Sequence, residues 1–199
     1  MIVTGLDLSL TGSGVATITS PDPNTWENPS QPHIRVTEYS SKPTLTDLES
    51  RSIRLRAVAG QVIHAARHSD VVAIEDLYMG NGTGAQLDRA GLWWIVVNSL
   101  ISIGIPVIPI ANNHLKMYAT GKGAGKGTDK DYVLAAAIKR YGHLADIVSN
   151  NTADALVLAA LTARHYGHPI EDNIPATNLR AVAAVRWVNL PTTPQEGTA

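Results

Sequence analysis

Short apolar segments along the chain predict five strands. The first, Ile2 to Ser9, is followed after a polar turn by the apolar residues 14–18, so a β-hairpin is expected there. His33 to Tyr39 alternates apolar and polar residues, which is typical of a third strand. Val71 to Glu75 is apolar up to its last residue, as in a central strand covered on both faces, and Pro106 to Ile110 is the fifth.

Longer segments carry apolar residues at helical spacing and predict the helices. The clearest cover Leu45 to His68, Gln86 to Ile103, Thr128 to Tyr141 and Asn151 to Tyr166, and a short one is expected from Asn178 to Val188. Three strands, a helix, and then alternating strands and helices are typical of an α/β fold. This order predicts a mixed five-stranded sheet flanked by helices on both faces.

A single domain is expected for most of the chain. The 199 residues are 44% hydrophobic, which is enough for one substantial core, and no change in composition marks a second domain. We place this domain at residues 1–167 and interpret residues 168–199 as a C-terminal extension with a short helix and a frayed end. The first residues lack the pattern of a secretory signal, which favours a cytoplasmic protein.

The uncharged stretch from Ala90 to Asn113 is about as long as a membrane span. It contains Gly104 and Pro106, however, which break it where a spanning helix would continue. We interpret it as a buried helix followed by a buried strand, and no membrane segment is expected.

The overall charge gives little indication of a partner. Only 17% of the residues are charged and the net charge is -1, so a nucleic-acid partner has to be argued from local clusters of charge. The chain contains no cysteine, which excludes disulfides and thiolate metal sites. Any metal ion would have oxygen or imidazole ligands.

Three acidic residues stand in strongly apolar surroundings. Asp7 and Glu75 each end an apolar strand, and Asp154 precedes an apolar helical run. Burying carboxylates is costly unless a cation or a function holds them there. Phosphodiester hydrolysis needs an activated water and positive charge near the phosphate, which two divalent ions held by a few carboxylates can supply. The three residues are therefore candidates for a catalytic metal site.

Each carboxylate also has a simpler explanation. Asp7 could end a strand and cap a turn, and Asn151 with Asp154 has the spacing of a helix capping box. Their co-occurrence in this order of elements favours the metal site over separate structural roles. Asp76 is left out, because in a strand it points to the opposite face from Glu75.

Several motifs resemble the RuvC family of Holliday-junction resolvases, especially its small phage-encoded members. The motifs are Gly5-Leu6-Asp7-Leu8-Ser9 with Gly12, Ala73-Ile74-Glu75-Asp76-Leu77-Tyr78-Met79, and Ala153-Asp154-Ala155-Leu156. Their order and separations, between Ile2 and Tyr166, are more specific than any one of them. The resemblance implies an RNase H-like fold and a metal-dependent crossover junction endonuclease. Such an enzyme resolves four-way junctions or other branched DNA and leaves 5′-phosphate and 3′-hydroxyl ends.

The resemblance also implies the ligands of two Mg²⁺ or Mn²⁺ ions per active site. The matching positions are Asp7, Glu75, Asn151 and Asp154. Asn151 departs from the family, which usually has Asp or His there, and an amide offers only a neutral oxygen. One ion should therefore be held more weakly, unless the neighbouring Asn150 also contributes.

Two further features favour DNA binding. Tyr78 stands where the family carries an aromatic residue that wedges against bases at the junction, although packing against a helix explains it equally well. The segment from Lys116 to Arg140 has six basic and two acidic residues, a net charge of +4, and residues 116–127 are expected to form a basic glycine-rich loop. The alternative is a solvated loop without a ligand. The residues expected to contact DNA are Tyr78, Lys116, Lys122, Lys126 and Lys130.

The block Trp93-Trp94-Ile95-Val96-Val97 in the second predicted helix carries more apolar surface than one sheet can cover. The resemblance implies a homodimer through this region. Two-fold symmetry suits the two symmetric nicks that a four-way junction needs.

Three rival functions stay open at this point. Asp7 with Ser9, Thr11 and Gly12 is similar to the phosphate loop of actin-like ATPases and sugar kinases. Those proteins need a second similar half that 199 residues do not provide, so no nucleotide cofactor is expected. A non-catalytic protein that binds branched DNA is consistent with the neutral Asn151. A nuclease acting on RNA or flaps would use the same carboxylates, because its specificity would lie in loop shape.

Overall fold

One mixed sheet organises the protein, whose computed structural model describes residues 1–21, 31–42, 46–77 and 85–190. The strand order is β3-β2-β1-β4-β5. β2 pairs antiparallel with β1 and β3, and β4 pairs in parallel with β1 and β5, so the predicted hairpin and mixed sheet are confirmed. The strands are β1 (Ile2–Asp7), β2 (Ser13–Thr19), β3 (His33–Tyr39), β4 (Val71–Glu75) and β5 (Val107–Ile110).

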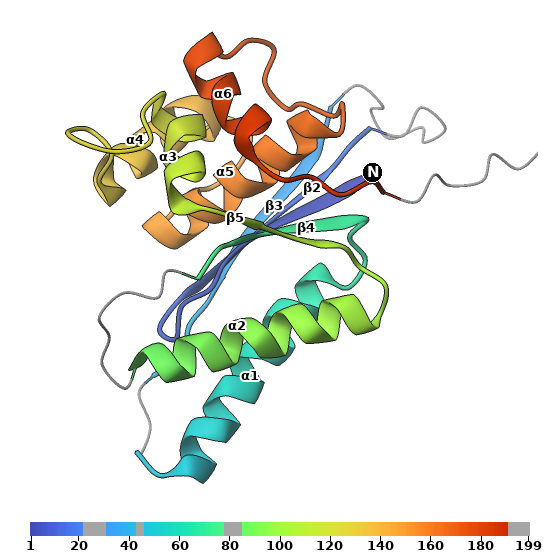
Figure 1. Ribbon diagram of the computed structural model, residues 1–199, viewed down its shortest axis with the longest axis vertical. Helices are drawn as coiled ribbons and strands as arrows, with labels where there is room; N and C mark the ends of the chain where they lie inside the picture. The colour runs from blue at the N-terminus through green and yellow to red at the C-terminus, as the bar shows by residue number, and fades with distance from the viewer. Residues whose placement is uncertain (22–30, 43–45, 78–84, 191–199) are drawn as a thin grey trace, which may run out of the picture.

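Helices cover both faces of the sheet, as the α/β prediction requires (Figure 1). α1 and α2 pack on one face, α5 lies on the other, and α3, α4 and α6 pack on the outside of α5. The helices are α1 (Leu48–Ala66), α2 (Ala85–Ser102), α3 (Asn112–Thr120), α4 (Lys130–Tyr141), α5 (Asn150–His165) and α6 (Ala176–Ala184).

The uncharged stretch from Ala90 to Asn113 contains most of α2 and all of β5, as predicted. Leu92, Val96 and Leu100 of α2 are fully buried in the core on the α1 side of the sheet. None of the helices in the described ranges is long and apolar enough to cross a membrane.

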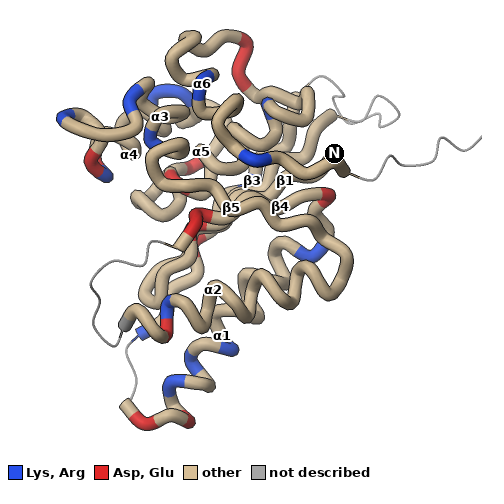
Figure 2. Tube along the Cα trace, viewed as in Figure 1, with Lys and Arg blue, Asp and Glu red and all other residues tan. Residues whose placement is uncertain are grey.

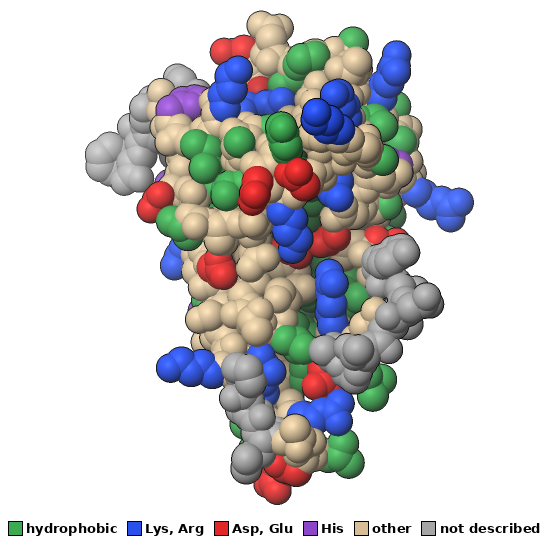
Figure 3. Space-filling model, turned by 90° about the vertical axis from the view of Figure 1, so that its left-hand side faces the viewer, with side chains coloured by type: hydrophobic (Ala, Val, Ile, Leu, Met, Phe, Trp, Pro, Cys, Tyr) green, Lys and Arg blue, Asp and Glu red, His purple; other side chains and the backbone are tan. Residues whose placement is uncertain are grey.

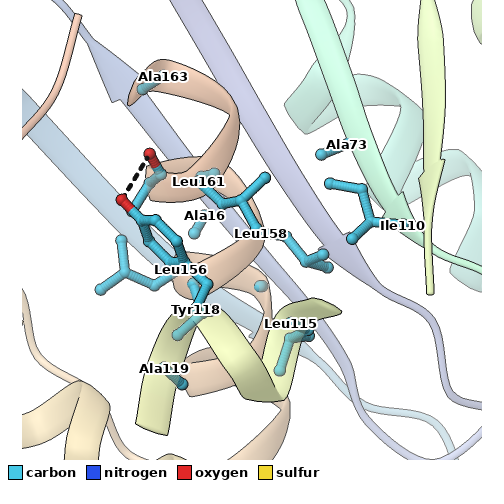
Figure 4. Close-up of a cluster of buried hydrophobic side chains, with 14 of the residues drawn as sticks. Ala16, Ala73, Ile110, Leu115, Tyr118, Ala119, Leu156, Leu158, Leu161 and Ala163 are labelled. Atoms are coloured by element: carbon cyan, nitrogen blue, oxygen red, sulfur yellow. Dashed lines mark hydrogen bonds between the residues drawn. The ribbon is translucent and has the colours of Figure 1, made fainter. Parts of the chain in front are cut away.

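Strand alternation gives the sheet one hydrophobic core on each face. On β1, Leu6 belongs to the core with α1 and α2, whereas Val3 belongs to the core with α5. Helix α5 is buried along residues 152–163, because the sheet lies on one side of it and the outer helices lie on the other. Figure 4 shows leucines of α5 packed between strand residues and the α3 side chains Leu115 and Tyr118.

Residues 116–127 are not one loop, so that prediction is wrong for its first part. Asn112–Thr120 form α3, which ends at Gly121 in the left-handed conformation with φ of 81°. The apolar face of α3, including Leu115, is buried in the core with α5. A short apolar pattern interrupted by Lys116 and next to several glycines hides this helix in the sequence.

The segment after α5 packs back onto the helical layer. Glu171 is 9% exposed and accepts hydrogen bonds from the hydroxyls of Tyr118 (2.9 Å) and Tyr141 (2.5 Å). The same carboxylate pairs with Arg164 at 3.0 Å. α6 starts and ends earlier than the short helix predicted from Asn178 to Val188, and its Ala181 belongs to the core with α5.

Candidate active site

Strand register brings Asp7 and Glu75 side by side at the ends of β1 and β4. These strands are parallel neighbours, and the register pairs Gly5 with Ala73. Ala73 belongs to the core on the α5 side, and residues two apart on a strand share a face. Asp7 and Glu75 therefore both point toward α5, whereas Asp76 is exposed.

Two glycines allow α5 to lie directly on the sheet. A Cβ atom at Gly5 would be 2.0 Å from the carbonyl oxygen of Ala155, and one at Gly14 would be 2.0 Å from that of Asn151. No side chain fits between the helix backbone and β1 or β2 at these positions. This close packing carries Asp154 to the ends of β1 and β4, where it is 7% exposed.

Burial and mutual repulsion raise the pKa of Asp7 and Asp154. Burial is the largest cause for both, and all the surrounding groups together raise the pKa of Asp154 to about 7. The negative charge of Glu75 raises the pKa of both groups. Asp7 is 5% exposed, and its pKa is raised further by the charge of Asp154 and by a hydrogen bond with Glu75. The charge of Lys130 opposes these shifts, and Lys116 opposes the shift of Asp154. The site thus holds more negative charge than its neighbours neutralise.

The donor atoms fit a hard divalent cation. Carboxylate and amide oxygens are the ligands that magnesium prefers. Asn150, one helical turn before Asp154, has a buried Oδ1 without a hydrogen-bond partner in the described part of the chain, so a further oxygen is available. In the same ranges no three His, Asp or Glu side chains are already grouped around one ion position. Magnesium does not require such a group, because it takes one or two carboxylates per ion and keeps several waters.

The raised pKa of Asp154 predicts that the metal-free protein loses stability as the pH rises. The pKa of this carboxyl group is 3.8 in the unfolded chain and about 7 in the folded one, so between these pH values the folded state binds an extra proton. The contribution of the Asp154 carboxyl to the free energy of unfolding is fully present below pH 3.8 and is lost by about pH 7, a change of about 4 kcal/mol. In EDTA, the melting temperature of Asp154→Asn should exceed that of wild type by a margin that grows from pH 4 to 7 and then levels off. A margin independent of pH would contradict this assignment.

Two residues that no sequence motif indicated contact Glu75. Asn112 Nδ2 donates a hydrogen bond to Glu75 Oε1 at 2.6 Å, and Arg89 lies 3.9 Å from Oε2. Asn112 is the first residue of α3, a helix that the sequence did not indicate. Arg89 is on the exposed side of α2, and only the packing of α2 beside β4 reveals its role.

Glu38 is a third residue that the sequence analysis missed. It lies on β3 opposite Gly14 of β2, which is itself opposite Asp7 of β1. Asn151 Nδ2 donates to Glu38 Oε1 at 3.4 Å, and the hydroxyl of Ser149 donates to Oε2. A signal was available, because Glu38 has the same strand parity as the core residues on β3 and is therefore a charge at an inward position.

The first turn of α5 excludes one of the simpler explanations. Its capping box is formed by Ser149 and Thr152, with the Thr152 N–H donating to Ser149 Oγ at 3.2 Å and the Ser149 N–H donating to Thr152 Oγ1 at 2.9 Å. The helix begins before Asn151, so the capping box considered for Asn151 and Asp154 is wrong. Neither side chain is needed to satisfy the helix end.

The predicted DNA-binding residues fall into separate groups. Lys116 on α3 and Lys130 on α4 act electrostatically on the carboxylates, whereas Lys126 is exposed in the connection between these helices. Lys122 borders a surface pocket of about 610 Å³ between α3 and α4 that is lined by further basic side chains. Figure 2 shows basic positions in blue along α3, α4 and their connection, and Figure 3 shows acidic and basic side chains close together across the middle of one face. Tyr78 lies outside the described residues, so its wedge role stays a prediction.

No protein-family model matches the sequence, and no curated protein matches it. The fold, however, has clear relatives among solved structures. RuvC of Thermus thermophilus is similar with a TM-score of 0.58 and 20% identity, over 84% of this chain and 98% of that one.

The same RuvC in complex with a Holliday junction substrate has a TM-score of 0.58 and 18% identity, over 84% of this chain and 98% of that one. The Fowlpox virus resolvase, solved with its substrate Holliday junction DNA, has a TM-score of 0.54 and 13% identity, over 84% of this chain and 99% of that one. At these identities the likeness concerns the fold, and the RNase H-like, RuvC-type fold expected from the motifs is confirmed.

Proposed function

We propose that the protein is a divalent-metal-dependent endonuclease that cuts branched DNA, with the four-way junction as its main substrate. The observation that supports this most strongly is the meeting of Asp7, Glu75 and Asp154 in one poorly solvated site at the strand ends. The fold adds to it, because the solved structures that share it include resolvases bound to Holliday junction DNA.

The residues of the site have distinct roles in this proposal. Asp7, Glu75, Asp154 and Asn151 hold two Mg²⁺ or Mn²⁺ ions. Bound ions supply an activated water and positive charge near the phosphate. Asn112 holds Glu75 through its hydrogen bond, which restricts the rotamer of that carboxylate.

Lysines next to the carboxylates provide the contact with the DNA backbone. Lys116 and Lys130 are close enough to influence the pKa of Asp154, so a phosphate bound to them lies beside the site. Lys122 and Lys126 extend the positive surface away from it along the connection between α3 and α4. Such contacts position DNA without reading its sequence.

A cleavage assay on synthetic substrates tests the proposal. Purified protein is incubated with a four-way junction, a matched duplex, a flap and an RNA–DNA hybrid, each with Mg²⁺, Mn²⁺, Ca²⁺ or EDTA. We expect the junction to be cut with Mg²⁺ or Mn²⁺ and to stay intact in EDTA. Equal junction binding in every condition without any cut would identify a non-catalytic binder. Preferred cutting of the flap or the hybrid would identify a different nuclease.

The proposed enzyme is a homodimer through α2. Trp93 points inward, and its indole N–H donates to the carbonyl oxygen of Glu75 at 3.1 Å. Leu87, Trp94 and Ile101 instead form an apolar stripe at seven-residue spacing, with exposed fractions of 71%, 54% and 55%. A solvated helix gains nothing from such a stripe, whereas a second copy of α2 would cover it.

Substitution within this stripe is expected to separate the dimer. Trp94→Lys places a charge in the middle of the interface, so a protein that elutes as a dimer should become a monomer in light scattering coupled to gel filtration. Leu179→Lys on α6, 40% exposed on the other side of the molecule, is the matched control and should leave the dimer intact. A Trp94→Lys protein that remains dimeric would place the interface elsewhere.

A further inference from the structure

Glu38 continues a row of acidic positions across the sheet. Glu75 on β4, Asp7 on β1, Gly14 on β2 and Glu38 on β3 stand at neighbouring register positions. Neighbouring strands are about 4.8 Å apart, so the backbone of Glu38 is two strands, or about 10 Å, from that of Asp7 across the sheet. Gly14 has no side chain, and the backbone of Asn151 in α5 occupies the space above it. Asn151 therefore lies between Asp7 and Glu38.

The contact between Glu38 and Asn151 determines how the amide is oriented. An ionised carboxylate only accepts hydrogen bonds, so the group of Asn151 that faces Glu38 Oε1 at 3.4 Å is the NH₂ group. The amide is planar, and its carbonyl oxygen consequently points away from Glu38. Gly12 closes the other side of the pair, because a Cβ atom there would lie 2.3 Å from Glu38 Oε1 and 2.9 Å from Asn151 Nδ2.

The second oxygen of Glu38 is fixed by the helix cap. The Ser149 hydroxyl donates to Glu38 Oε2, and its oxygen accepts the N–H of Thr152, so its donor and acceptor roles are both used. Both carboxylate oxygens thus contact the first turn of α5, and a negative charge at the N-terminal end of a helix is favourable. Glu38 is held in a defined position relative to Asn151.

We propose that Glu38 is a positioning residue for the metal site. It orients the Asn151 amide so that the carbonyl oxygen is the atom offered to a divalent ion, and it supplies the negative charge that the neutral amide lacks. This inference rests on the proposed function, because it requires an ion held by Asp7, Glu75 and Asp154. The inference also explains why residue 151 is an asparagine. A carboxylate at this position would stand at hydrogen-bonding distance from the carboxylate of Glu38, with no proton between them, and the two would repel each other.

Four proteins test this pairing by Mn²⁺ binding, measured calorimetrically on the full chain without DNA. They are wild type, Glu38→Gln, Asn151→Asp and the double variant. A glutamine can accept from Asn151 and donate to Ser149, so Glu38→Gln keeps the contacts and removes the charge. We expect Glu38→Gln to weaken Mn²⁺ binding about 10-fold, as loss of a group that orients a ligand typically does. Asn151→Asp should raise the Mn²⁺ affinity of the Glu38→Gln protein about 10-fold and that of wild type much less.

Two results would overturn the pairing. One is unchanged Mn²⁺ affinity in Glu38→Gln, and the other is an equal effect of Asn151→Asp in both backgrounds. Ser149→Ala is the control for a purely structural role, because it removes the cap and its contact with Glu38. It should lower the melting temperature and weaken Mn²⁺ binding less than Glu38→Gln does, because Glu38 keeps its charge and its contact with Asn151. A loss of affinity equal to that of Glu38→Gln would show that Glu38 acts only through the helix end.

A second measurement covers a Glu38→Gln protein that does not fold. Asn151→Asp alone should melt at a lower temperature than wild type without metal and should be stabilised more than wild type by Mn²⁺. Identical melting curves and shifts would overturn the pairing. A wild-type protein that binds no Mn²⁺ would overturn the proposed function together with this inference. If wild type and Glu38→Gln bind Mn²⁺ and cut junctions equally well, the inference alone is overturned.

Discussion

Replacing Asp7 by Asn is expected to reduce junction cleavage by about a thousand-fold or more, equivalent to about 4 kcal/mol in the activation barrier. Asp7 stands at the centre of the site, beside Glu75 on the neighbouring strand and close enough to Asp154 for their charges to interact. An amide keeps the size of the side chain and removes the charge that a divalent ion requires. Junction binding should stay within about threefold of wild type, because phosphate contacts dominate DNA affinity.

Asp76→Asn is the matched control for this experiment. Asp76 is exposed and follows Glu75 directly, so its loss changes the net charge equally without touching the site. Cleavage is measured at fixed Mg²⁺ on the same junction, and binding is measured in Ca²⁺. The metal-free Asp7→Asn protein should also be more stable than wild type, because it no longer buries a repelled carboxylate. Equal cleavage by Asp7→Asn and wild type would contradict the proposed site.

Gly14→Ala is expected to destabilise the protein by about 3 kcal/mol or more. The added Cβ atom would lie 2.0 Å from the backbone oxygen of Asn151 and 3.0 Å from the backbone nitrogen of Thr152, and neither can move without the whole of α5. The helix must shift away from β2, which opens the core and moves Asp154. Urea unfolding followed by circular dichroism measures the change.

The matched control for Gly14 is Gly60, an exposed position in the middle of α1. A Cβ atom there meets nothing within 4 Å. Gly60→Ala should therefore stabilise the protein by about 0.5–1 kcal/mol, because alanine favours the helix. The two substitutions are expected to change the free energy of unfolding in opposite directions. A Gly14→Ala protein as stable as wild type would show that α5 does not depend on this close contact.

The sequence was sufficient for the parts of the site that lie on regular elements. Asp7 and Glu75 end apolar runs, and the strand period of two puts both on one face without further information. Asp154 could be placed on a helix, but its distance from the strands could not, because that depends on Gly5 and Gly14 as contact points.

The remaining parts depend on contacts between distant segments. The contact of Glu38 with Asn151 joins residues 113 positions apart, and that of Asn112 with Glu75 joins residues 37 apart. No local pattern contains this information. The start of α5 was also misplaced, because Ser149, Asn150 and Asn151 are all good helix caps and only the structure distinguishes them.

The enclosure of α5 has a consequence for when the acidic site assembles during folding. Residues 152–163 of α5 are buried on every side and most of them are apolar, so α5 is stable only when its neighbours have formed. Those neighbours come from both ends of the chain, from β1 at residue 2 to α6 at residue 184. Contacts this distant in sequence form slowly and late. A chain still emerging from the ribosome therefore has no assembled acidic site, because Asp154 joins Asp7 and Glu75 only when α5 packs on the sheet.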